Sequence, residues 1–76
     1  MNRPIFEIAK DIRNDWTNAS LYALPYLEAM DELDSIEDRY IFDSAKSVVR
    51  YFLANATPWK GEVAREIKKE LKDMVA

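Results

Sequence analysis

Residues 44–74 read SAKSVVRYFLANATPWKGEVAREIKKELKDM, and this stretch decides the fold because two helical patterns flank a short break. In the first pattern, apolar residues recur at spacings of three and four, which is typical of one face of an α-helix. The pattern predicts a helix over 44–55, with Ile41 as a candidate to extend its buried face by one turn. The buried stripe predicted for this helix is Ala45, Val48, Val49, Phe52 and Leu53.

The break is marked by residues that end one helix and begin another. Asn55 is suited to end a helix in the left-handed conformation. Thr57 precedes a proline, which disfavours helical backbone there, and Pro58 fits the first helical position. We therefore expect the last helix over 58–74, with Gly61 inside it, where a ligand or a crossing helix approaches closely. Its predicted buried stripe is Trp59, Val63, Ile67, Leu71 and Met74.

Two further helices are predicted in the N-terminal half. Pro4 opens a helix over 4–15, whose apolar stripe is Ile5, Ile8, Ile12 and Trp16. A second helix is expected over 20–33, with Asn18 or Ser20 as its cap and Pro25 either in its first turn or at a kink. Its apolar face is predicted to contain Tyr22, Tyr26, Met30 and Leu33, with Ala23 and Leu27 beside it.

The segment 34–43 is predicted to be a loop with one helical turn. Ser35 and Asp38 have the spacing of a capping box, while Asp43 is a candidate cap for the helix that follows. Residues 40–42 are the only strand candidate, with nothing to pair with. The sequence thus predicts an all-α fold, a single domain over 1–76. The expected architecture is a compact antiparallel bundle of about four short helices, or a three-helix core crossed by a fourth.

Composition removes several classes of function. The 76 residues include no cysteine and no histidine, so zinc sites, thiol nucleophiles and Ser-His-Asp triads are excluded. No phosphate-binding or nucleophile-elbow motif occurs, so we expect no enzyme, no cofactor and no metal site. No apolar run is long enough to span a membrane, and charges at residues 7–13 interrupt any signal peptide. A cytoplasmic protein is expected.

Charge is concentrated in residues 28–43, which contain seven acidic residues and one arginine, for a net charge of −6. We call this range the acidic segment. Its spacing fits no calcium loop, which needs a glycine at the sixth position and a glutamate at the twelfth. It is either a solvated, solubilising surface or a binding surface for a basic partner. The candidate partner-binding residues are Glu28, Asp31, Glu32, Asp34, Glu37 and Asp38.

The last helix has a basic stripe opposite its predicted apolar face, formed by Arg65, Lys68, Lys69 and Lys72. This basic stripe is a candidate nucleic-acid contact. Acidic residues of the same helix, such as Glu62 and Glu66, argue against nucleic-acid binding. They repel phosphates, and each has a basic residue three positions later with which it can form an ion pair.

Nine aromatic residues are more than a bundle of this size can bury fully. Trp16 and Trp59 lie near helix ends, where they either close a thin core or anchor an interface. The four tyrosines pose the same choice. Exposed ring surface favours a partner or a homodimer.

The run YFLANATPWKGE at 51–62, followed by AREIKKELK at 64–72, resembles small uncharacterised helical proteins encoded by bacterial phages, plasmids and integrative elements. Those proteins share the pattern "PYLxAM … YFLxNAxxWRGExAxxIKxELK", and residues 25–30 here read PYLEAM. The resemblance spans most of the chain, and Lys60 departs from it where arginine is expected. It implies an accessory protein of a mobile element and no assigned activity.

Together these observations predict a non-catalytic, acidic accessory protein that binds a protein partner, such as a host or defence component. Nucleic-acid binding through the basic stripe is the alternative, and homodimerisation is compatible with both.

Overall fold

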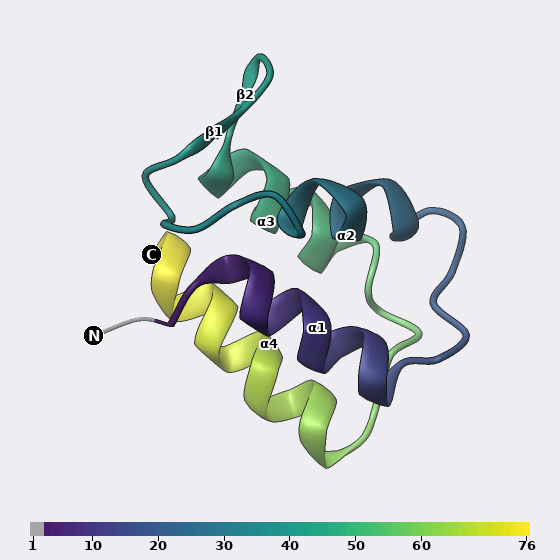
Figure 1. The fold of residues 1–76 in the computed structure, drawn as a ribbon. Coiled ribbons are helices and arrows are strands. Elements are labelled where there is room, and N and C mark those ends of the chain that lie inside the picture. The colour runs from purple at the N-terminus through teal and green to yellow at the C-terminus, as the bar shows by residue number, and fades with distance from the viewer. Residues whose placement is uncertain (1–2) are drawn as a thin grey trace.

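The computed structural model describes residues 3–76, which form four helices and one short β-hairpin (Figure 1). The elements, in chain order, are α1 (Ile5–Asp15), α2 (Leu24–Met30), β1 (Arg39–Tyr40), β2 (Asp43–Ser44), α3 (Ala45–Ala54) and α4 (Glu62–Val75).

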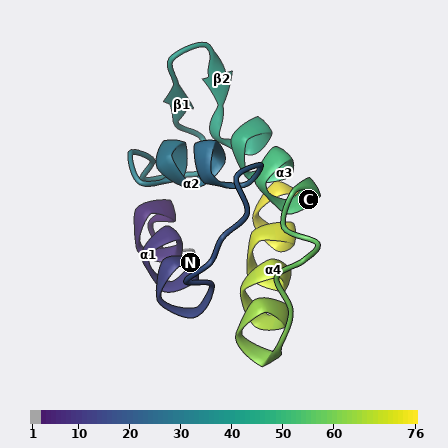
Figure 2. The ribbon, with the colours of Figure 1, turned by 90° about the vertical axis from the view of Figure 1, so that its right-hand side faces the viewer.

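The four helices form a closed ring in which each packs against two others. α1 contacts α2 and α4, and α3 contacts the same two helices. Consecutive helices run in roughly opposite directions, and the hairpin extends beyond them (Figures 1 and 2). The predicted antiparallel bundle is therefore confirmed, although the hairpin means that the fold is not purely all-α.

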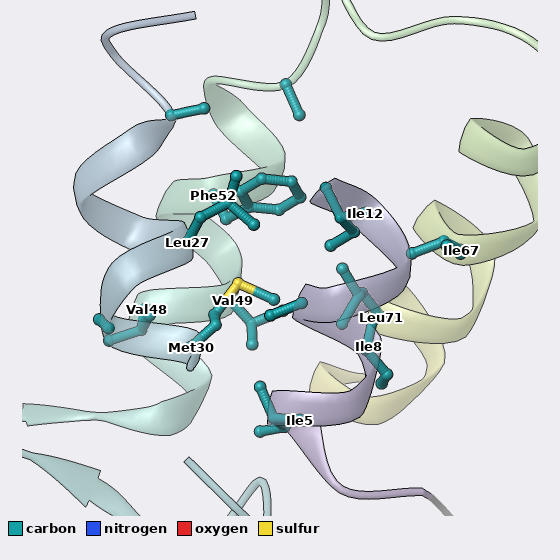
Figure 3. Packing of buried hydrophobic residues seen from close by; sticks show 14 of the residues in the cluster. Ile5, Ile8, Ile12, Leu27, Met30, Val48, Val49, Phe52, Ile67 and Leu71 are labelled. Carbon is teal, nitrogen blue, oxygen red and sulfur yellow. The ribbon is translucent and has the colours of Figure 1, made fainter. Parts of the chain in front are cut away.

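The core lies where the apolar stripes of the four helices meet (Figure 3). Ile5, Ile8 and Ile12 of α1 are fully buried, as their spacing predicts. Phe52 of α3 is fully buried opposite Ile12, beside Leu27 of α2. Every described residue that is buried is apolar, so burial of hydrophobic side chains is the main stabilising term.

The start of α1 shows how the loop and the bundle depend on each other. No side chain caps α1. Instead, the N–H groups of Ile5 and Phe6 donate to the carbonyl oxygens of Asp34 and Leu33, at 2.8 and 2.9 Å. These bonds satisfy donors that a helix start leaves open, and they tie residues 33–34 to the bundle.

α2 is shorter than the range of 20–33 predicted for it. Pro25 lies in its first turn, and the preceding turn is held by the Ser20 carbonyl, which accepts from Ala23 and Leu24. No side chain caps this helix, so the predicted cap at Asn18 or Ser20 is wrong. Tyr22 lies before the helix and is exposed rather than buried.

α4 begins at Glu62, not at residue 58. Thr57 and Pro58 lie in a turn, and Gly61 directly precedes the helix with a φ of +115°. A Cβ at this position would have nothing within 4 Å, so lack of space does not require a glycine. The positive φ does, because residues with a side chain rarely adopt it. No crossing helix approaches Gly61 within the described residues. The buried face also differs: Ala64 is buried, whereas Val63 is 42% exposed.

The hairpin contradicts the prediction that residues 40–42 have nothing to pair with. Arg39 pairs with Ser44 and Tyr40 with Asp43 in an antiparallel ladder closed by a two-residue turn. Ser44, not Asp43, caps α3, because its hydroxyl accepts from the N–H of Ser47 at 3.1 Å. The predicted Ile41 extension of α3 is therefore wrong.

The turn before the hairpin agrees with the capping-box pattern. The Asp38 carboxylate accepts from the N–H groups of Asp34 and Ser35, at 3.0 and 3.1 Å, and the Ser35 hydroxyl accepts from Glu37. At the other end of α3, the helix ends near Asn55 as predicted. Asn55 is not left-handed, since its φ is −103°.

Candidate interaction surfaces

The acidic segment passes from α2 through the loop to the hairpin, along one end of the molecule (Figure 2). Of its six candidate residues, five are exposed and Asp38 is half-buried. Two of the six bond within the chain: Asp31 pairs with Arg13 at 2.8 Å, and Asp38 accepts hydrogen bonds in the loop turn.

Four of the six candidate carboxylates have no cation beside them. Within residues 3–76, no ion pair involves Glu28, Glu32, Asp34 or Glu37. All four are exposed, so their charges face solvent.

The hairpin tip is a surface that the sequence analysis missed. Ile41 is 73% exposed and Phe42 is 90% exposed. The available signal was a β-branched and aromatic run between polar residues, which is typical of a hairpin strand. This run did not predict a hairpin, because a two-residue hairpin turn usually contains glycine or asparagine and residues 41–42 contain neither.

The backbone of the tip is strained. Ile41 has a φ of +56°, a conformation that crowds its Cβ and costs about 1–2 kcal/mol in an L-residue. Among residues 3–76 it is the one non-glycine residue with a positive φ. A β-branched side chain is especially unfavourable there.

The basic stripe of α4 is only partly free. Arg65, Lys69 and Lys72 are exposed. Lys68 is half-buried: its Nζ donates to the Trp59 carbonyl at 2.6 Å and lies 5.8 Å from the centre of that indole ring. Burial, with smaller contributions from Lys72 and Lys60, lowers the pKa of Lys68 below its ordinary value.

The two tryptophans close the end of the core. Trp59 is 2% exposed, stacks on Trp16 with ring centres 5.7 Å apart, and donates its indole N–H to Asp15 at 2.8 Å. Phe52 contacts both rings edge-on. Trp59 is therefore part of the core and Trp16 packs partly exposed against it, whereas Tyr22 and Tyr51 are exposed.

A shallow groove of about 550 Å³ lies between α1 and α4. Arg3 lies in it, held by Glu70 and by Asp11, and these bonds raise the pKa of the Arg3 guanidinium. Through its bonds to Glu70, Arg3 links the N-terminal segment to α4. The groove is lined by Arg3, Asp11, Asn14, Asp15, Val63, Glu66, Ile67 and Glu70, which include no nucleophile of the serine, cysteine or lysine type.

Within residues 3–76, no group of three or more acidic, histidine or cysteine side chains is arranged to hold a metal ion. In the same range, no helix is both long and apolar enough to cross a bilayer.

Searches against protein-family models, curated proteins and solved structures each returned no significant match.

Proposed function

We propose that this chain is a non-catalytic module that binds a protein partner through its acidic segment, as an accessory protein of a mobile genetic element. The proposal rests on four exposed carboxylates that form no ion pair within the described residues. They lie in α2 and in the loop that follows it: Glu28, Glu32, Asp34 and Glu37. A basic surface on the partner would lower the repulsion among them.

The rest of the molecule supports a binding role over a catalytic one. Lys68, whose pKa is lowered by burial, is bonded to the Trp59 carbonyl rather than directed into a cleft. The resemblance to mobile-element proteins supplies the setting and remains a prediction.

The test is affinity capture from nuclease-treated bacterial lysate with the immobilised chain. The variant Glu32→Lys/Glu37→Lys should retain the specific partner at least about tenfold less than the original chain, because two attractive charges become repulsive. The matched control is Glu66→Lys/Asp73→Lys, which makes the same change in net charge on exposed residues of α4.

Equal loss in both variants would show that only net charge matters. Unchanged retention by Glu32→Lys/Glu37→Lys would contradict the proposal.

Nucleic-acid binding remains the second candidate, supported by the exposure of Arg65, Lys69 and Lys72. It predicts retention of nucleic acid that falls steeply with salt and is lost in an Arg65→Gln/Lys69→Gln/Lys72→Gln variant. Absence of binding at low ionic strength would exclude it.

A further inference from the structure

We infer that the hairpin tip, Ile41 and Phe42, is the apolar anchor of the acidic segment, and that its partner is a protein with an apolar pocket bordered by lysine or arginine. The inference rests on the proposed function and specifies the chemistry of the partner.

The tip is placed to enter a pocket on another protein. The hairpin projects away from the helices in both views (Figures 1 and 2). Phe42 is the most exposed of the large apolar side chains in the described range, at 90%, and Ile41 lies beside it at 73%. Two adjacent apolar side chains on a projection fit a concave site better than a flat one.

The base of the hairpin is anchored to the rest of the fold, and an anchored projection loses less entropy on binding than a free one. Tyr40 at its base packs against the core, as does Ile36 in the preceding turn. The N–H of Ala45, the first residue of α3, donates to the Asp38 carbonyl at 2.8 Å. The hairpin therefore continues into α3 without a flexible linker.

The identity of the turn residues is not explained by folding. A turn that only closes the hairpin would be more stable with glycine or asparagine where φ is positive. Ile41 instead has a φ of +56° and leaves its side chain in solvent. Strain of this kind is often found at functional sites.

Charge selects the occupant among the possible partners of an apolar tip. The acidic segment that contains the tip has a net charge of −6, with Arg39 its one cation. A second copy docked tip to tip would bring two such segments together, and anionic lipids and nucleic acids would be repelled in the same way. An apolar protein pocket with a basic border is complementary both to the side chains of Ile41 and Phe42 and to the negative charge of the acidic segment.

The experiment places a photo-crosslinking benzoylphenylalanine at position 42 of the full chain. The chain is irradiated in nuclease-treated bacterial lysate, and the crosslinked peptides are sequenced. We expect the label to attach to apolar residues that have lysine or arginine nearby in the partner. The same label at Leu21, which is 81% exposed but outside the acidic segment, is the matched control and should not crosslink to that protein.

Affinity of the identified partner then separates side-chain chemistry from folding. Phe42→Ser should weaken binding by roughly 30-fold, the size of a typical anchor residue, whereas Phe42→Leu should retain most of it and Leu21→Ser should not change it. Circular dichroism would confirm that all three variants keep the helical content of the original chain.

Each remaining outcome overturns the inference in a distinguishable way. If binding of the partner is weakened by substitution of Glu32 and Glu37 but not of Phe42, the proposed function is supported and the role of Phe42 as an anchor is refuted. A crosslink between two copies would show self-association instead, and an acidic or purely polar crosslinked site would refute the pocket. If no protein is captured, both proposals fail.

Discussion

Lys68 illustrates, at the scale of one residue, how a charge predicted to contact a ligand is used within the fold. Its ammonium lies half-buried against Trp59, so burial penalises the charged form. Because the pKa is lowered, the folded chain binds fewer protons than the unfolded chain between that pKa and the ordinary value of 10.5. The free energy of unfolding therefore rises with pH across this window.

We expect Lys72→Gln to raise the pKa of Lys68 towards its ordinary value, because one of the cations that lower it is removed. The shift is partial, since burial is the larger cause. It is measured by following the Lys68 side-chain resonances in an NMR titration. Lys46→Gln is the control, because Lys46 is not among the groups that shift Lys68. An unchanged pKa in Lys72→Gln would show that Lys72 does not contribute to the shift.

At the scale of the element, the start of α4 depends on a backbone conformation rather than on a cap. No side chain caps this helix, and Gly61 turns the chain into it with φ +115° and ψ −179°. This region of backbone space is occupied almost only by glycine.

We expect Gly61→Ala to lower the free energy of unfolding by about 1–3 kcal/mol, because alanine must adopt the same strained backbone. The surrounding space is open, so no steric clash adds to this cost. Urea denaturation measures the change, and Lys60→Ala is the control at the preceding exposed position. A loss within experimental error of Lys60→Ala would mean that the turn tolerates a side chain.

At the scale of the whole molecule, a small core makes each large side chain important. A 76-residue domain has a total stability of about 4–11 kcal/mol. Phe52 connects the α1–α4 half of the bundle to α2 and α3, and it also contacts the tryptophan pair.

Phe52→Ala should therefore remove about 3–5 kcal/mol, a large share of the total, because it leaves a cavity in the centre of the core. Thermal and urea unfolding measure the loss. If that variant does not fold, Phe52→Leu should, with a smaller loss. Tyr51→Ala, at the neighbouring position that is 54% exposed, should cost much less. Equal losses at positions 51 and 52 would contradict the described core.

The sequence by itself determined the helical class, the bounds of α1 and α3 to within one residue, the acidic segment, and the break after Asn55. Each of these depends on residues close together in the chain, where helical periodicity and local charge act. The start of α2 and the buried face of α4 needed the tertiary structure, because Tyr22 and Val63 have the right spacing for burial but remain exposed in the folded chain.

The hairpin was also decided by tertiary structure. Its two-residue strands carry too few residues for a period, and the turn places isoleucine in a conformation that its own preference opposes. Its continuation into α3 and the packing of Tyr40 against the core help to stabilise that arrangement. Local patterns therefore predicted the scaffold and the charge. The exposed tip depends on contacts across the fold, which a pattern in the sequence does not record.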